Sequence, residues 1–233
     1  MQRETDADPV WVARLARCSL HRSTDALREA AEETSLFRSL AREHAKERRP
    51  SYVAIDAPLE LYALVRLLRP QHVVEVGVSS GVSSAYLLAG LQRNRKGTLH
   101  SIDLPTFPRA RAGNRAPVQG TWTLPPGRSS GWAVPFPLRG RWDLRLGDKR
   151  DVIPLLAEEL ASVEMFVYDV PHRDRESDRE FRAIDGCLGP GAVAIADHGP
   201  TGDLCAAHRR WARRRGAVPV RRSALGLYGF ACA

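Results

Sequence analysis

The sequence predicts an α/β fold in which a doubly wound, mostly parallel sheet carries helices on both faces. Strand-like and helix-like segments alternate along most of the chain, which is the order that builds parallel sheets. The most regular unit spans residues 72–88, where a valine-rich run at 73–76 breaks at Gly77 and feeds an amphipathic helix. Two strand-like segments at 218–220 and 227–231 close the series, and we expect them to form a hairpin-like pair across SALG.

The segment before the first strand is helical in pattern. Pro9 suits a first helical turn after Asp8, and a break between two helices is expected at Ser23–Asp25. Because this segment precedes the alternating units, we expect residues 1–57 to form a helical extension and residues 58–233 to form the ligand-binding domain.

The remaining elements follow from the spacing of apolar residues. A helix is expected over Pro58–Leu68, where leucine and valine recur at helical intervals before Pro70. Further strands are expected at 98–102, 142–146, 165–168 and 192–196. A helix is expected after each of the last three: one that holds Val152, Ile153 and Leu160, one that holds Phe181, Ile184 and Leu188, and one from about Leu204 to Gly216.

Residues 104–141 form a long segment rich in proline, glycine and arginine, with Trp122, Trp132 and Phe136 interleaved. A loop of this length inside a domain is usually functional or disordered. Its aromatic residues could form a wall of an acceptor pocket and its arginines could hold an anionic group, or the segment is a surface excursion with partly packed tryptophans. Both interpretations stay open.

Composition and charge bound the class of protein. With 233 residues, 43% hydrophobic and 27% charged, the chain resembles an ordinary soluble globular protein. The net charge of +8 and the pI near 9.8 raise the question of nucleic acid, an acidic substrate or a membrane surface. The arginines are spread along the chain, however, and no RRM, KH, zinc-finger or helix-turn-helix pattern accompanies them, which disfavours nucleic acid.

The cysteines and the first residues point to a reducing compartment. Cys18, Cys187, Cys205 and Cys232 are scattered without a CxxC pair, which suggests small buried thiols and neither a zinc site nor a disulfide framework. The segment MQRETDADP is polar and acidic, and no apolar run reaches membrane-spanning length. We therefore expect a cytoplasmic protein that does not contact a membrane.

The turn after the first strand has the chemistry of a ligand loop. Gly77 and Gly81 allow close backbone approach, and the helix that follows directs N–H groups and a positive dipole end at a ligand above the strand. Glu75 would repel a pyrophosphate and favour a cationic amine or sulfonium, and the dinucleotide and nucleoside-triphosphate motifs are missing. Asp103, at the end of the second strand, is placed to accept hydrogen bonds from ribose hydroxyls.

The stretch EVGVSSGVSS resembles the first motif of class I S-adenosylmethionine-dependent methyltransferases, in the ExGxxxGxS form of small-molecule O-methyltransferases. The region around Trp142, Asp148 and Pro154 is similar to the bacterial small-molecule methyltransferase family 24. The resemblance implies a Rossmann-like, seven-stranded sheet with an antiparallel last strand, and S-adenosyl-L-methionine as cofactor. Carried onto this sequence, it assigns cofactor binding to Glu75, Gly77, Ser79, Gly81, Ser83, Asp103, Asp148 and Asp169. Asp148 is equally suited to cap the following helix.

The same resemblance supplies candidates for catalysis. Asp169 and His172 match the family's DxxH pattern, although Val170 and Pro171 depart from its commoner form. His172 is the candidate base for an acceptor hydroxyl and Asp169 could orient it, or His172 is an uninvolved loop histidine. Alternatively, Asp169 and Asp197 hold Mg²⁺. His198 stands where relatives carry an acid or an asparagine, which weighs against that metal.

The leading hypothesis is thus an S-adenosylmethionine-dependent methyltransferase that acts on a small molecule, at a hydroxyl oxygen. A nucleic-acid methyltransferase and a noncatalytic cofactor-binding protein are the alternatives. In related enzymes an N-terminal extension often covers the active site or makes a dimer contact, so a homodimer is also an expectation of the resemblance.

Overall fold

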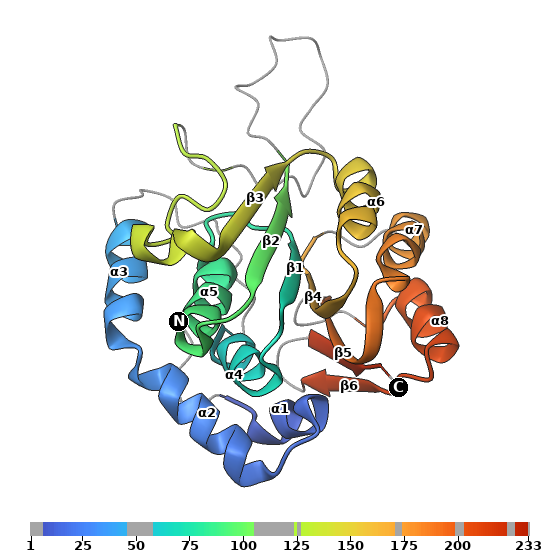
Figure 1. The fold of residues 1–233 in the computed structure, drawn as a ribbon, viewed down its shortest axis with the longest axis horizontal. Coiled ribbons are helices and arrows are strands. Elements are labelled where there is room, and N and C mark those ends of the chain that lie inside the picture. Colours follow the sequence, from blue (N-terminus) through green and yellow to red (C-terminus); the bar gives the residue numbers. More distant parts are fainter. Residues whose placement is uncertain are drawn as a thin grey trace.

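A seven-stranded sheet of order β3-β2-β1-β4-β5-β7-β6 runs through the molecule (Figure 1). The computed structural model describes residues 7–45, 58–104, 124, 127–170, 174–198, 203–222 and 227–232. Five strands are parallel, and β7 pairs antiparallel with both β5 and β6. The predicted doubly wound sheet with an antiparallel last strand is confirmed. The strands are β1 (His72–Val76), β2 (Thr98–Asp103), β3 (Trp142–Leu146), β4 (Val163–Tyr168), β5 (Leu188–Asp197), β6 (Pro219–Arg222) and β7 (Leu227–Ala231).

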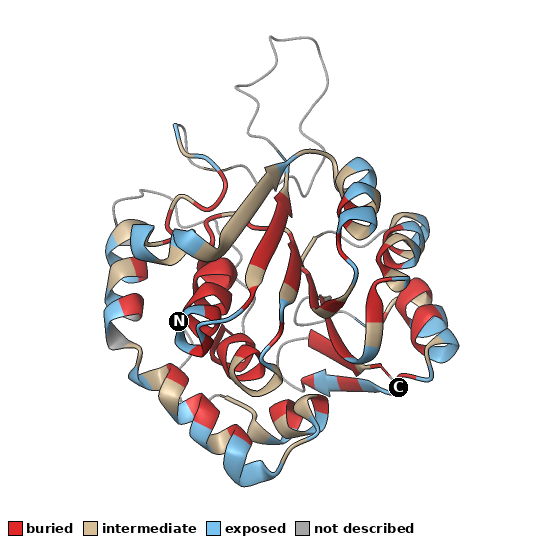
Figure 2. Cartoon of the chain, viewed as in Figure 1, coloured by how far each residue is buried: buried red, intermediate tan, exposed pale blue. Residues whose placement is uncertain are grey.

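Helices cover both faces of the sheet, and their outer surfaces carry most of the exposed residues (Figure 2). Alternate residues of β1 point to opposite faces, as the period of a strand requires. Val73 therefore packs in a cluster with α4 and α5, whereas Val74 and Val76 pack in a second cluster with α6, α7 and α8. The helices are α1 (Pro9–Ala16), α2 (Leu20–Glu32), α3 (Thr34–Ala45), α4 (Pro58–Leu68), α5 (Val82–Asn94), α6 (Lys149–Glu159), α7 (Asp174–Asp185) and α8 (Ala206–Arg214).

The N-terminal region contains three helices, and the expected break at Ser23–Asp25 is wrong. The Asp8 side chain caps α1 as expected, but α2 begins after Ser19 and continues through Ser23. The Ser23 hydroxyl donates to the carbonyls of Leu20 and Pro9, both at 2.8 Å. Its hydrogen-bonding capacity is therefore used inside the helix, although serine is a residue type typical of helix N-caps.

The N-terminal helices pack on the same core as the sheet. Trp11 of α1 is buried and its indole Nε1 donates to the carbonyl of Val220 in β6 at 2.8 Å. Leu15 fills the space where a side chain at Gly229 of β7 would stand. The boundary proposed at residue 57 lies outside the described residues, so the division into 1–57 and 58–233 stays a prediction.

The strand β5 is longer than predicted. Leu188 starts this strand, where the sequence pattern had assigned it to the preceding helix. Between Leu188 and Val193 the pairing with β4 shifts register, because four intervening residues of β5 face only one of β4. Gly189, Pro190 and Gly191 of this segment are residue types that favour such a bulge.

Part of the predicted loop at 104–141 has regular structure. Residues Phe136–Arg141 form a short 3-10 helix, η2, that leads into β3. Phe136 is 85% exposed, whereas Trp132 packs against the core. Trp122 lies outside the described residues, so the pocket wall proposed for it stays a prediction.

Two further expectations concern cysteines and membranes. All four cysteines are free thiols, with Cys187 and Cys232 buried and Cys18 and Cys205 half-buried. Among the residues that the structure describes, no helix combines the length and the apolar character that crossing a bilayer requires.

Candidate functional site

The strand order reverses its direction between β1 and β4, and the sequence-predicted site residues gather near this point. On one side of β1 the order runs outward through β2 and β3, and on the other side it runs through β4 and β5. In doubly wound sheets the crevice beyond the carboxyl ends of the strands at such a reversal is the usual ligand site. The Gly77–Gly81 loop and Asp169 follow strands that end at this edge, and Asp103 is the last residue of β2.

Gly77 brings β1 and β4 together at this edge. Its φ of +94° lies in the region that glycine adopts readily, and its N–H donates to the carbonyl of Ile102 at 2.9 Å. A Cβ at this position would lie 1.9 Å from the carbonyl oxygen of Asp169. The Asp169 N–H in turn donates to the Val76 carbonyl at 2.9 Å. Gly77 is therefore required by the close passage of the chain after β4.

Asp103 lies against the same loop. Its Oδ2 accepts a hydrogen bond from the backbone N–H of Ser79 at 2.9 Å, and its Oδ1 accepts one from Leu104 at 2.8 Å. Ser79 adopts a left-handed φ of 51°, which turns its N–H toward the carboxylate. This contact holds the end of β2 and the loop after β1 in one unit.

A cover segment, Ser129–Val134, lies over the loop and was not foreseen from the sequence. The N–H groups of Gly131 and Ala133 donate to the carbonyls of Ser79 and Ser80 at 2.8 and 3.0 Å. Gly131 also passes so close to Trp142 that a Cβ there would meet the indole ring at 2.1 Å. The small residues Ser129, Ser130 and Gly131 were the available signal, since they permit such a close approach.

Glu75 is enclosed beneath α5, and three serines surround its carboxylate. Oε1 accepts from Ser83 at 2.6 Å, and Oε2 accepts from Ser84 at 2.6 Å and from Ser101 at 2.7 Å. Burial raises the pKa of Glu75, and the three hydrogen bonds partly oppose this rise.

The side chain of Glu75 thus lies within the protein, fully buried, and not on the surface of the loop. Sequence reasoning pointed Glu75 and Ser83 at the cofactor and missed that they bind each other. Their contact with a ligand stays a prediction, whereas their support of the first turn of α5 is visible in the structure.

Asp148 caps α6, the alternative use that the sequence suggested for it. Its Oδ1 accepts from the backbone N–H of Arg150 at 2.9 Å, and the Arg150 guanidinium pairs with both carboxylate oxygens. The hydrogen bonds from Arg150 lower the pKa of Asp148 to about 2. The Gly147 N–H donates to the Asp103 carbonyl at 2.8 Å, so Asp103 and Asp148 lie at the ends of adjacent strands. The contact of Asp148 with adenine stays a prediction.

Asp169 follows β4, and Asp197 is the last residue of the neighbouring strand β5. Tyr168 of β4 pairs with Ala196 of β5, so the next residue of each strand reaches the same edge of the sheet. Both aspartates are half-buried. His172, the candidate base, lies outside the described residues. Its role, and the Mg²⁺ site at the two aspartates, stay predictions.

A buried polar cluster behind this edge fixes the end of β4. The Tyr168 hydroxyl donates to Glu180 of α7, and the Lys149 ammonium of α6 donates to Tyr168 at 3.1 Å and to Glu180 at 2.9 Å. Burial raises the pKa of Tyr168 further above its ordinary value. The phenol is therefore a neutral hydrogen-bond donor to the carboxylate, and the cluster joins α6 and α7 to the strand that precedes Asp169.

Solved structures share this fold at low sequence identity. A methyltransferase from Geobacter sulfurreducens is 18% identical, with 85% of this chain and 89% of that chain covered and a TM-score of 0.55. An O-methyltransferase from Bacillus cereus, solved in complex with S-adenosylhomocysteine, is 14% identical, with coverages of 85% and 90% and a TM-score of 0.52. The O-methyltransferase TomG from Streptomyces achromogenes, involved in tomaymycin synthesis and solved with S-adenosylmethionine, is 16% identical, with coverages of 85% and 89% and a TM-score of 0.54.

A family model, and not a similar curated sequence, shows the family of this chain. A comparison with curated protein sequences returned no match. A family model described as a methyltransferase domain matches residues 74–198, which is more than half of the chain. The match begins within β1, includes the Gly77–Gly81 loop, Asp103 and Asp169, and ends one residue after β5. The chain therefore belongs to this family of methyltransferase domains.

Proposed function

We propose that this protein transfers a methyl group from S-adenosyl-L-methionine to a hydroxyl oxygen of a small molecule. The observation that carries the proposal is the Asp103 carboxylate, held by the Ser79 N–H beside a glycine loop at the reversal of strand order. The Bacillus cereus and Streptomyces achromogenes enzymes of the same fold, which are O-methyltransferases solved with S-adenosylhomocysteine and S-adenosylmethionine, support the choice of cofactor and of oxygen.

The residues present fit such a cofactor. The helix α5 begins at Val82 after the N-cap residue Gly81, which has no side chain to cap it, so the N–H groups of its first turn are suited to a carboxylate. Asp103 would accept hydrogen bonds from the ribose, and Asp148 would lie on the adenine side. Glu75 and Ser83 would hold the first turn of α5 in place behind the ligand, with Gly77 and Ser79 shaping the loop.

When bound, the cofactor supplies an electrophilic methyl group on a sulfonium. The main task of the protein is to align the acceptor, a proximity effect of about 7 kcal/mol or more. We propose His172 as the base that removes the proton from the acceptor hydroxyl, a contribution of roughly a hundredfold or more, with Asp169 orienting it or positioning the cofactor. In the alternative that we keep, Asp169 and Asp197 bind Mg²⁺, which would lower the pKa of the acceptor hydroxyl.

Titration calorimetry of the full chain with S-adenosylmethionine and S-adenosylhomocysteine tests the proposal. Asp103→Asn should weaken binding about tenfold or more, because one of the two acceptor oxygens becomes an NH2 group, which cannot accept a hydrogen bond from a ribose hydroxyl. Asp25→Asn, on the exposed face of α2, is the matched control and should leave binding unchanged. No binding of either compound by the wild-type chain would refute the proposed cofactor.

The finer assignments have separate measurements. His172→Gln should reduce turnover of an accepted substrate while leaving cofactor binding intact. Removal of activity by a chelator, with recovery in Mg²⁺, would favour the metal alternative. RNA binding that weakens steeply with salt would favour the nucleic-acid methyltransferase instead. The cytoplasmic location and the homodimer remain predictions of this proposal.

A further inference from the structure

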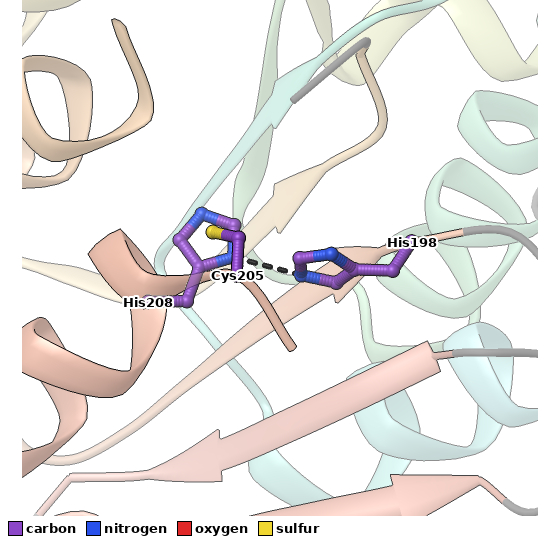
Figure 3. Close-up of side chains that lie close together, drawn as sticks. All are labelled: His198, Cys205 and His208. Atoms are coloured by element: carbon purple, nitrogen blue, oxygen red, sulfur yellow. Dashed lines mark hydrogen bonds between the residues drawn. The ribbon is translucent and has the colours of Figure 1, made fainter. Parts of the chain in front are cut away.

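Three side chains that bind metals well in proteins lie together at the end of β5 (Figure 3). His198 follows the last residue of this strand, Cys205 occupies the N-cap position of α8, and His208 lies in the first turn of that helix. One ligand atom from each residue lies within 4.8 Å of the other two. Nε2 of His198 and Nδ1 of His208 point toward each other at 2.9 Å, and the two ring planes are nearly perpendicular, at 83°.

We propose that His198, Cys205 and His208 bind a zinc ion, with a fourth coordination position left for water or another ligand. Two imidazoles and one thiolate form a donor set that suits zinc, whereas carboxylates suit Mg²⁺. Its ligands differ from the two carboxylates proposed for Mg²⁺, Asp169 and Asp197, and it does not depend on the proposed methyl transfer.

The geometry needs little adjustment to hold the ion. Two nitrogens bound at about 2.0–2.1 Å from a tetrahedral zinc are about 3.3 Å apart, so the two nitrogens must separate by about 0.4 Å, and the rings must turn so that both lone pairs point at the ion. In the absence of a metal, the 2.9 Å contact requires one proton between Nε2 of His198 and Nδ1 of His208. A zinc ion replaces that proton and accepts both lone pairs.

Cys205 must give up its proton to bind the ion, as any cysteine ligand does. Burial, and next to it the Asp174 carboxylate, raise the pKa of the Cys205 thiol, and the backbone N–H groups of His208 and Ala207 oppose this rise only in part. Asp174, at the start of α7, accepts from the Ala207 N–H at 3.2 Å and lies beside the same thiol. Zn²⁺, the Cys205 thiolate and the Asp174 carboxylate together are electrically neutral, which limits the cost of burying the ion.

Aromatic side chains hold the two histidines in place. The His208 ring lies 4.2 Å from the ring of Phe181 and 5.8 Å from that of Tyr168, and His208 is fully buried. The His198 ring lies 5.4 Å from that of Tyr228, in an edge-on arrangement. Ligands whose rotamers are fixed in this way are preorganised for a metal. The bound ion would join the end of β5 to the start of α8.

Cobalt and zinc titrations of the full chain, free of any histidine tag and stripped of metal, test this site. One equivalent of Co²⁺ should produce a thiolate-to-cobalt charge-transfer band, and zinc should displace it. Cys205→Ser should abolish the band and weaken zinc binding by more than about a hundredfold, since even residues that only support metal ligands contribute about 10–100-fold. Zinc should also raise the melting temperature of the wild-type chain but not that of Cys205→Ser.

Matched variants separate this site from the other thiols and histidines. Cys18→Ser, at the junction of α1 and α2, and His21→Gln, on the exposed face of α2, should retain the band and the zinc affinity. If Cys205→Ser does not fold, His198→Gln provides the same test at a half-buried position. A chain that shows no charge-transfer band, or a band that survives in both Cys205→Ser and His198→Gln, would overturn the proposal.

Discussion

Replacing Gly77 by alanine should lower the free energy of unfolding by more than backbone strain alone would, because it also disturbs the edge where β1 and β4 meet. The added Cβ would lie 1.9 Å from the Asp169 carbonyl oxygen, although side-chain carbons essentially never approach a neighbour within 3.0 Å. The obstructing atom belongs to the backbone, so the chain after β4 must move. The φ of +94° adds strain of its own, because an alanine adopts this conformation reluctantly.

The two contributions can be separated with a second glycine. Gly127 has a φ of +79°, but a Cβ there would meet no described atom within 4 Å. Gly127→Ala should therefore cost only the backbone strain, about 1–2 kcal/mol. Gly77→Ala should cost this amount plus about 1–3 kcal/mol for overpacking, a total of roughly 2–5 kcal/mol, with about 2–4 °C of melting temperature lost per kcal/mol in a chain of this size.

Urea denaturation followed by circular dichroism measures both free energies of unfolding. Calorimetry with S-adenosylhomocysteine supplies an independent measurement, because displacement of Asp169 should weaken cofactor binding in Gly77→Ala and leave it unchanged in Gly127→Ala. Equal losses of stability in the two variants would refute the reasoning, since they would show that the contact with Asp169 costs nothing.

Two further predictions concern the buried carboxylate of Glu75. Ser101→Ala should cost about 2–4 kcal/mol of unfolding free energy, because it removes a donor to Glu75 and also the acceptor for Nε1 of Trp142, which lies 2.9 Å from Ser101 Oγ. Ser84→Ala removes one donor but gains helix propensity, so about 1–2 kcal/mol is expected, and the reverse order in denaturant titrations would contradict the assignment. Glu75→Gln should alter the pH dependence of stability. Because the folded chain raises the pKa of Glu75 above its ordinary 4.5, the stability from this group is complete below that value and is lost as pH rises toward the folded pKa, by up to about 1.4 kcal/mol per pH unit. The advantage of wild type over Glu75→Gln should therefore shrink between pH 4.5 and neutrality, and a constant difference would show that Glu75 titrates normally.

Local sequence patterns were sufficient for elements whose apolar residues have one clear period. The helix Pro58–Leu68 and the strand Trp142–Leu146 occur at their predicted bounds. The pattern failed where a polar or apolar residue has a tertiary partner. Ser23 resembles a break but donates to Pro9 in another helix, and Leu188 continues the helical spacing of α7 but pairs with β4.

The candidate site could be predicted as a set of strand ends, but not as a set of contacts. The order of strands and acids along the sequence was enough to place Asp103 and Asp169 at one edge. Which serines enclose Glu75 depends on the register between β1 and β2, which brings Ser101 directly beside it. The absence of a CxxC motif made Cys205 look like a structural thiol, because its partners His198 and His208 belong to no common spacing pattern.

The hydrogen bond between Trp11 and Val220 also bears on biosynthesis. It joins residues 209 positions apart, and Arg17 likewise donates to the carbonyl of Cys232 at 2.6 Å. During translation α1 is made long before β6 and β7, so at first it can pack only on α2 and α4. The hydrogen bonds of Trp11 and Arg17 to the last strands can therefore form only after nearly all of the described chain has been synthesised.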